Sequence, residues 1–226
     1  MHEGGIDAAA RRALDVLVSA ALLAALAPLL VAVAVAVRAT SPGPALFVQV
    51  RVGRDGRRFR LHKFRTMVTD APRRGPRITV GADPRVTPFG AWLRRTKIDE
   101  LPQLWDVLRG ALSLVGPRPE LPEWVLRWTR SERRLLRVRP GITDPASLAF
   151  VDEAALLATA ADPTHFYATV VAPAKLALSL EYLERRTVWT DLAVLLQTAL
   201  RLVGLVGGPP PSVVAAGAAP RREVAR

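Results

Sequence analysis

The sequence contains no cysteine and little histidine. The absence of cysteine among its 226 residues excludes disulfide bonds, cysteine-based zinc sites and a thiol nucleophile. The three histidines, His2, His62 and His165, are scattered along the chain, so we expect no histidine-rich metal site. No glycine-rich Walker pattern is present either, which argues against a P-loop nucleotide enzyme.

Negative charge is scarce relative to positive charge. Lys and Arg total 32 against 20 Asp and Glu, and Lys63, Lys97 and Lys175 are the only lysines. Such a surplus favours polyanionic partners: nucleic acid, anionic lipid or phosphate-bearing ligands. Arginine also matches phosphate oxygens at two points. A coding bias toward arginine explains the surplus equally well, so charge alone does not choose a partner.

One long stretch near the N-terminus lacks charge altogether. No charged residue occurs between Asp15 and Arg38. A bilayer core needs about 20 apolar residues, whereas the apolar core of a signal peptide has about 7–15. We therefore expect a polar flank over residues 1–12 and a membrane-embedded helix over residues 13–38.

The basic residues around this helix bear on its topology. Arg11 and Arg12 flank one end and Arg38 the other, and the positive-inside rule draws both ends toward the cytoplasm. Pro28 lies near the midpoint and removes a helix hydrogen bond there. The residues alone slightly favour a kinked spanning helix, and a helix broken at Pro28 that returns to the same side is the alternative.

After residue 40 the pattern becomes that of strands and helices. Alternation in "ALFVQVRVG" and "RRFRLHKFRTM" around the turn "RDGR" predicts a small basic β-hairpin. The hairpin suits anionic headgroups or a phosphate site. The fold class expected is α+β, mainly helical, with a helical domain over residues 39–206 that carries amphipathic interfacial helices. Residues 207–226 have the composition of a disordered tail. The expected helices are "AWLRRTKI", residues 121–138, residues 152–186 with breaks at Pro163 and Pro173, and residues 188–206.

An acidic pair interrupts this basic chain at "TKIDELPQLWDVLRGALSLVGPRPE". Proline is tolerated in the first turn of a helix, so Pro102 places Asp99 and Glu100 at a helix N-terminus. We expect Asp99 to be the N-cap of a helix that runs to about Leu108.

Cations converge on the acidic pair. Together with the helix dipole they are expected to lower the pKa of both carboxyls, so that both are ionised at neutral pH. That state suits a Mg²⁺ ligand or a carboxylate nucleophile, and converging cations and carboxylates suit a magnesium diphosphate. An isolated pair of this kind is more often a helix cap with surface ion pairs. The cations near the pair are Lys63, Arg65, Arg94, Arg95 and Arg118.

The chain resembles the bacterial sugar transferase family, the monotopic phosphoglycosyl transferases, over residues 11–200. The order and density of the shared motifs make the resemblance specific. They are "RRALDVLVSAALL", "SPGPALFVQVRVGRDGRRFRLHKFRTM", "DPRVTPFGAWLRRTKIDELPQLWDVLRGALSLVGPRPE", "RPGIT", "PAKLALSLEYL" and "WTDLAVLLQTAL".

The resemblance implies an enzyme that moves a sugar phosphate from a UDP-sugar to polyprenyl phosphate, with release of UMP. It implies Mg²⁺ as cofactor and a covalent intermediate, in which Asp99 is the nucleophile on the sugar-bearing phosphorus. Asp99 and Glu100 are expected to hold the metal. The residues expected to bind phosphate are Lys63, Arg65, Arg94 and Arg118.

The resemblance also decides between the two topologies. It implies a re-entrant helix broken at Pro28, with both ends and the catalytic domain on the cytoplasmic face of the inner membrane. Expected partners are the membrane, the donor, the acceptor and downstream glycosyltransferases, and no nucleic acid is expected. We expect the minimal form of the family, without a large additional N-terminal membrane domain.

Several positions depart from the family pattern. Ala27 stands where Ser often precedes the helix-breaking proline, Asp106 replaces an Asn, and "GALS" replaces "GDMS". After "PGIT", residues 144–147 read "DPAS" in place of Gly-Trp-Ala-Gln, near the expected nucleotide or sugar site. The identity of the donor therefore stays open.

Two further hypotheses remain beside this one. The first is a non-catalytic, membrane-anchored protein that binds polyanions. It would use the same arginines and apolar segment, but the acidic pair would have no role in it. The other keeps the reaction but transfers directly, with Asp99 as metal ligand or base. A phosphosugar trapped on Asp99 separates covalent from direct transfer.

Overall fold

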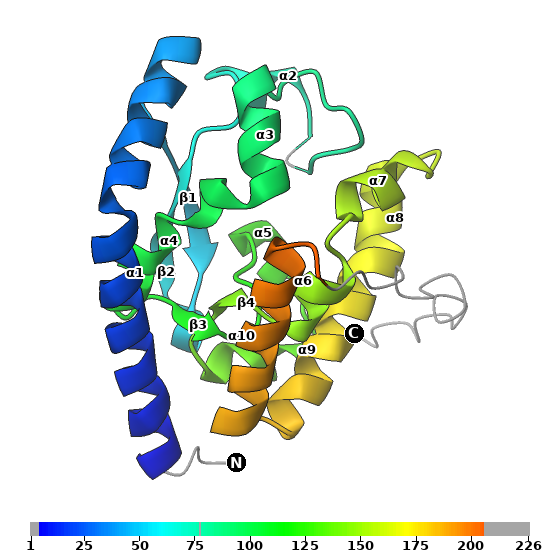
Figure 1. Ribbon diagram of the computed structural model, residues 1–226. Helices are drawn as coiled ribbons and strands as arrows, with labels where there is room; N and C mark the ends of the chain where they lie inside the picture. The colour runs from blue at the N-terminus through cyan, green and yellow to red at the C-terminus, as the bar shows by residue number, and fades with distance from the viewer. Residues whose placement is uncertain (1–4, 77, 206–226) are drawn as a thin grey trace.

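The computed structural model describes residues 5–76 and 78–205. One long helix, α1 (Gly5–Thr40), lies along the whole of one side of the molecule (Figure 1). The remaining helices are short, and two small two-stranded sheets lie among them. This confirms a mainly helical chain with a long apolar N-terminal helix and small sheets. The tail expected over residues 207–226 lies outside the described residues.

Helix α1 differs from the expected membrane helix in two respects. It begins at Gly5 rather than at Ala13, so the described part of the polar flank belongs to the helix. It also continues through Pro28, and the break expected there is not present in this structure. A proline removes one backbone hydrogen bond, and helix-forming residues on both sides keep the remaining turns intact. Its length and apolar composition are sufficient to cross a membrane, which indicates membrane association.

The N-terminal part of α1 is fixed to the rest of the protein by polar contacts. Arg12 donates from Nη1 to the carbonyl of Val107 at 2.7 Å and from Nη2 to that of Leu108 at 2.9 Å. The carboxylate of Asp15 accepts from the Leu114 N–H at 2.8 Å and from the Ser113 hydroxyl at 3.0 Å. These buried polar contacts hold this end of α1 against protein rather than lipid.

The C-terminal part of α1 packs on the same body through apolar contacts. Val33 and Val37 are buried in one cluster with Phe64 and Leu93. Between the two anchored ends, most side chains of α1 are exposed. The two ends of the apolar helix therefore contact one folded unit.

The basic hairpin forms as predicted. β1 (Leu46–Val52) pairs antiparallel with β2 (Arg58–Phe64), around a short turn at Arg54–Gly56. Asp55 and Gly56 take left-handed backbone conformations with φ of 57° and 74°, which the Asp-Gly sequence tolerates. The hairpin lies beside α1 and carries Lys63 to the acidic pair (Figure 1).

A second, parallel pair of strands was not predicted. β3 (Ser113–Val115) lies beside β4 (Gly141–Thr143), and each is only three residues long within a Gly- and Pro-rich segment. The two chains approach so closely that a Cβ on Gly141 would lie 2.1 Å from the nitrogen of Gly116. This close packing fixes the Pro117–Pro119 loop that follows β3.

The other helices support this frame. The region 121–138 is less helical than expected, and Pro173 lies in the first turn of α9 without breaking the helical path that enters from η4. The amphipathic α10 is confirmed. The helix expected over residues 91–98 forms as α3, but it begins earlier, at Pro88, and ends at Thr96. The bounds are α2 (Ala71–Arg74), α3 (Pro88–Thr96), η2 (Ile98–Glu100), α4 (Gln103–Leu108), α5 (Pro122–Val125), η3 (Glu132–Arg137), α6 (Pro145–Ala149), α7 (Glu153–Ala158), α8 (Pro163–Phe166), η4 (Tyr167–Val171), α9 (Ala172–Glu184) and α10 (Val188–Leu202).

Candidate active site

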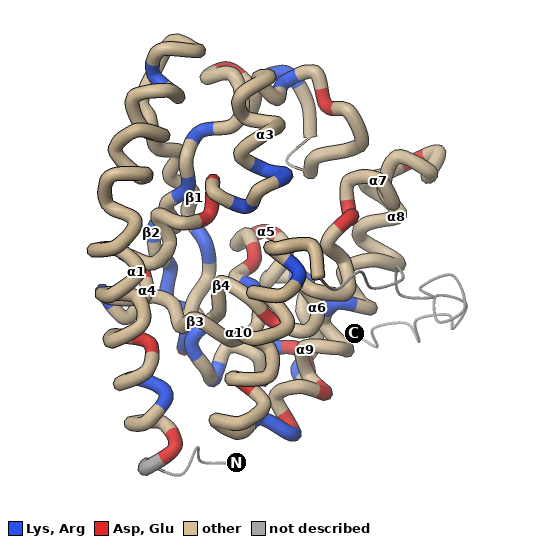
Figure 2. Tube along the Cα trace, in the orientation of Figure 1, with Lys and Arg blue, Asp and Glu red and all other residues tan. Residues whose placement is uncertain are grey.

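The acidic pair lies in a tight turn between two helices. α3 ends where Lys97 takes a left-handed conformation with φ of 59°, and the single turn η2 then carries Asp99 and Glu100. α4 begins only at Gln103, after Pro102. The expectation that Asp99 is the N-cap of this helix was wrong, because η2 separates the pair from α4. Figure 2 shows acidic residues of this turn between basic residues of α3 and of the hairpin.

Glu100 is fully engaged by cations. Arg118 donates from Nη2 to Oε1 at 2.5 Å and from Nη1 to Oε2 at 3.0 Å. Lys63 Nζ lies 2.9 Å from Oε1, and the Gln103 amide donates to Oε2 at 3.2 Å. Burial opposes ionisation of Glu100, but the charges of Arg118 and Lys63 outweigh it and hold the pKa well below its usual range. Glu100 is therefore anionic and fixed in position.

Asp99 has the opposite surroundings. Its side chain is buried, and Oδ1 has no hydrogen-bond partner among the described residues. Burial raises the pKa of the Asp99 carboxyl, and the neighbouring charge of Glu100 raises it further, against the lowering effect of Lys63 and Arg94. The expectation that the cations lower the pKa of both carboxyls was thus correct for Glu100 and wrong for Asp99. Burial, which the sequence did not reveal, decides the difference.

Arg94 lies on the Asp99 side of the site. Its guanidinium donates to the hydroxyl of Thr66 at 2.8 Å and to that of Thr79 at 3.0 Å, which fixes its orientation. Lys63 and Arg94 are the cations that act most strongly on Asp99, whereas Arg118 acts chiefly on Glu100. The structure therefore brings together five of the six predicted site residues, namely Lys63, Arg94, Asp99, Glu100 and Arg118.

Arg65 is the predicted site residue whose side-chain contacts lie away from the acidic pair. Its guanidinium donates to the carbonyls of Ser41, Pro42 and Pro44 at 2.8, 2.6 and 2.6 Å. These carbonyls follow the end of α1, and Arg65 is buried among them. Its contacts hold the link between α1 and β1, so this geometry does not support the phosphate contact predicted for it.

A cavity of about 350 Å³ lies beside Arg118. Sequence reasoning did not find it, because its walls come from segments that are distant in the chain: the Pro117–Glu120 loop, α5, η4 and α9. Asp144 lines the cavity and is the N-cap of α6. Asp144 Oδ1 accepts from the Ser147 N–H at 2.8 Å, and Oδ2 accepts from the Ser179 hydroxyl at 2.9 Å.

The acidic pair fits a magnesium ion that is shared with a phosphate ligand. Within residues 5–76 and 78–205 no group of three or more His, Asp or Glu side chains forms a complete metal site. Mg²⁺ in phosphate-binding sites is usually held by one or two carboxylates, with substrate oxygens and water as the other ligands. The unpartnered Oδ1 of Asp99 supplies one such donor. Each oxygen of Glu100 already accepts two hydrogen bonds, so Glu100 would hold the ion only if one of these contacts opened.

Comparison with known proteins identifies the family of the chain. The model of the family described as bacterial sugar transferase matches residues 6–204. The undecaprenyl-phosphate glucose phosphotransferase of Komagataeibacter xylinus is 41% identical over 207 residues, which cover 86% of this chain and 36% of the relative. The chain belongs to the bacterial sugar transferase family.

Other relatives are also named as undecaprenyl-phosphate sugar phosphotransferases. The UDP-glucose:undecaprenyl-phosphate glucose-1-phosphate transferase of Escherichia coli (strain K12) is 32% identical over 87% of this chain and 41% of its own length. The UDP-N-acetylgalactosamine-undecaprenyl-phosphate N-acetylgalactosaminephosphotransferase of Aeromonas hydrophila is 34% identical over 83% and 42%. The chain thus spans less than half the length of these members of the family, which differ in the sugar that they name.

Proposed function

We propose that this protein is a phosphoglycosyl transferase that moves a sugar 1-phosphate from a UDP-sugar to polyprenyl phosphate. The products are UMP and a polyprenyl-diphospho-sugar, which downstream glycosyltransferases extend in glycan assembly. The observation that carries the proposal is the unpartnered, buried Oδ1 of Asp99, which the charges of Lys63 and Arg94 act on, next to a Glu100 that is fixed by Arg118. A carboxylate held free among phosphate-binding cations is suited to attack phosphorus.

The first step forms a bond between an Asp99 carboxylate oxygen and the sugar-bearing phosphorus. The bond from that phosphorus to the bridging oxygen breaks, and the electron pair leaves with UMP. Burial raises the pKa of the Asp99 carboxyl and leaves its anion poorly solvated, and the charges of Lys63 and Arg94 oppose that rise and favour the anion. The same cations stabilise the charge on the equatorial phosphate oxygens during displacement.

The second step transfers the phosphosugar to the lipid. An oxygen of polyprenyl phosphate attacks the phosphorus of the aspartyl phosphosugar, and the bond from phosphorus to the Asp99 carboxylate breaks. The carboxylate returns to its original state, so no oxidant or additional co-substrate is needed. Covalent catalysis divides one displacement between two anions into two steps with separate substrates.

Glu100 and the cations position the ligand in both steps. Bound Mg²⁺ would neutralise charge on the diphosphate oxygens. Asp99 would hold it through the unpartnered Oδ1, and Glu100 would join only if it released a contact with Lys63 or Gln103. Arg118 donates to both oxygens of Glu100 and to the Ile142 carbonyl at 3.0 Å, so Glu100 is held in one orientation. Such fixed charges cost little reorganisation during the reaction.

The proposal includes a membrane topology. Both ends of α1 lie at the cytoplasmic face of the inner membrane, together with the catalytic domain. Because α1 is continuous through Pro28 in this structure, entry into the leaflet and return requires the helix to bend at Pro28 in the membrane. The support is that Arg12 and Asp15 near one end, and Val33 and Val37 near the other, contact the same folded body. A helix that crosses the membrane separates its ends by the bilayer, which is about 30 Å thick in its hydrocarbon core.

The reaction is tested with the purified full chain, Mg²⁺, polyprenyl phosphate and a panel of UDP-sugars. We expect UMP release with at least one donor, and loss of release in Asp99→Asn. Asp55→Asn is the matched control, because Asp55 is exposed in the hairpin turn and Asn tolerates its left-handed conformation. UMP release that is equal in Asp99→Asn and the wild type would contradict a role for this carboxylate. The polyanion-binding alternative predicts no release and a steeply salt-dependent affinity for nucleic acid.

A further inference from the structure

The cavity beside Arg118 is not used in the reaction steps proposed above. Arg118 lines it, but Asp99, Glu100, Lys63 and Arg94 do not. Its volume of about 350 Å³ is within the range of small-ligand pockets, about 300–1,000 Å³. A space that shares one cation with the reacting centre is placed to bind a non-reacting part of the same ligand.

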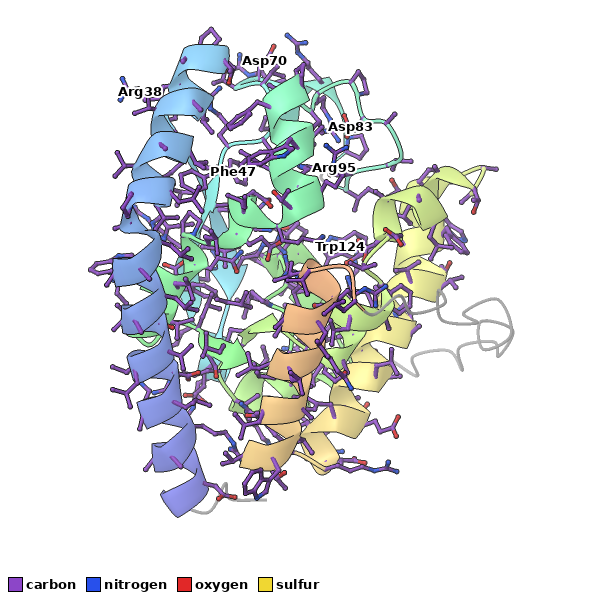
Figure 3. All side chains as sticks on the ribbon, in the orientation of Figure 1. Arg38, Phe47, Asp70, Asp83, Arg95 and Trp124 are labelled. Atoms are coloured by element: carbon purple, nitrogen blue, oxygen red, sulfur yellow. The ribbon has the colours of Figure 1, made fainter. Side chains whose placement is uncertain are left out.

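The wall of the cavity is aromatic and carries both signs of charge. Its cations are Arg118, Arg127 and Lys175, and its carboxylates are Glu120, Glu132 and Asp144. Trp124 and Tyr167 meet edge to face with ring centroids 5.2 Å apart, and Trp128 also lines the cavity. The guanidinium of Arg127 lies 4.9 Å from the Trp124 ring centroid. Figure 3 shows Trp124 just below the lower end of α3. Planar bases are bound by such combinations of aromatic rings and arginine.

The positions of the charged side chains define an orientation for a bound diphosphate ligand. Arg94 and Lys63 act on Asp99, Lys63 also reaches Glu100, and Arg118 extends from Glu100 to the cavity. A diphosphate with its reacting phosphorus at Asp99 therefore directs its second phosphorus toward Arg118. In a nucleotide-sugar, the group attached to that second phosphorus is the nucleoside.

We infer that the cavity binds the nucleoside of the donor, with its base against Trp124, Trp128 and Tyr167, and that the transferred sugar lies at the opposite end, toward Arg94. This inference rests on the proposed function. It also assigns the altered loop at residues 144–147 to the nucleotide side of the site, because Asp144 lines the cavity. That loop then affects affinity for the nucleotide rather than the choice of sugar.

The test fills the cavity without touching the reacting groups. Ala168 lines the cavity and is half-buried, so Ala168→Phe places a ring in the space of the base. Ala155→Phe on the exposed side of α7 is the matched control. Trp128→Leu removes one aromatic wall and is a second, independent variant. UMP binding to the full chain is measured by calorimetry, and the KM for the donor is measured in parallel.

We expect Ala168→Phe and Trp128→Leu each to weaken UMP binding by about tenfold or more and to raise the donor KM by a similar factor. The control should leave both unchanged. Melting curves that match the wild type show that each variant is folded.

Two results would overturn the inference while the proposed function stands: UMP affinity unchanged in both variants, or a raised donor KM with UMP affinity intact, which would place the sugar in the cavity. A wild-type chain that neither binds UMP nor turns over any donor would remove the proposed function, and this inference with it.

Discussion

Arg118 binds both carboxylate oxygens of Glu100, with Nη2 2.5 Å from Oε1 and Nη1 3.0 Å from Oε2. The adjacent residue, Asp99, keeps an unpartnered oxygen in a buried position. Neighbouring carboxyls thus have pKa values displaced in opposite directions. Two carboxyls whose pKa values are shifted in opposite directions typically have different roles in a reaction. Here Glu100 keeps a fixed negative charge, and Asp99 reacts.

Asp99→Asn should abolish transfer and raise thermal stability at neutral pH. The pKa of Asp99 is raised in the folded state, so its ionisation opposes folding, and stability is lost as pH rises through the folded value. The amide removes that cost, and each kcal/mol gained raises Tm by about 2–4 °C for a chain of this size. Melting curves at pH 4 and pH 8, with Asp55→Asn as control, check the sign. A variant less stable than the wild type at both pH values would contradict the assigned burial cost.

Lys63→Met should move the acidic limb of the pH–rate profile to higher pH. Asp99 must be ionised to attack, and Lys63 is the cation that most lowers its pKa. Removing this charge raises the pKa of Asp99, so a higher pH is needed to ionise the same fraction. Rates are measured with saturating donor across the acidic range. Arg60→Met, an exposed cation on the same strand, should leave the limb in place. An unmoved limb in Lys63→Met would show that Lys63 does not control this ionisation.

Arg65→Gln should weaken the fold and spare substrate binding. The wild-type side chain satisfies the carbonyls of Ser41, Pro42 and Pro44. Buried acceptors left without partners cost about 1–3 kcal/mol each, so we expect a loss of about 2–4 kcal/mol in the free energy of unfolding. The donor KM should stay within about twofold in the folded fraction. A large rise in KM with unchanged Tm would return Arg65 to the phosphate-binding set.

The topology of α1 is testable by cysteine labelling, because the natural chain has no cysteine. Single cysteines at Ala9 and Thr40, both exposed, should react with an impermeant maleimide from the same, cytoplasmic side of oriented vesicles. A cysteine at Ala25, in the middle of the helix, should be protected from both sides. Labelling of the two ends from opposite sides would establish a spanning helix and contradict the re-entrant proposal.

Local pattern was sufficient for much of the fold. Alternation around Asp55-Gly56 predicted the hairpin, and the uncharged run after Asp15 predicted the long apolar helix. The β3–β4 pair escaped prediction, because strands of three residues carry too little periodicity to distinguish them from the surrounding Gly- and Pro-rich loops. At Pro28, the residues alone slightly favoured a kinked spanning helix and the family resemblance implied a break, whereas the helix continues through the proline.

The candidate site, like the fold, could be predicted only in part. The residue types and their order were sufficient to select Asp99, Glu100 and Arg118. They did not reveal that Asp99 is buried without a partner for Oδ1, since burial depends on how β2, α3 and η2 pack together. Arg65 was selected by its neighbours in sequence, but in an antiparallel hairpin the residue after β2 lies beside the start of β1, near the end of α1.

The central claim is that Asp99 forms a covalent bond to the phosphosugar. The most direct measurement is the intact mass of the full chain after incubation with Mg²⁺ and a UDP-sugar that supports turnover, without polyprenyl phosphate. The account predicts an added mass equal to one sugar phosphate, located on Asp99 by peptide mapping, discharged by polyprenyl phosphate and absent from Asp99→Asn. A wild-type chain that releases UMP only when polyprenyl phosphate is present, and never gains this mass, would contradict the account and establish direct transfer.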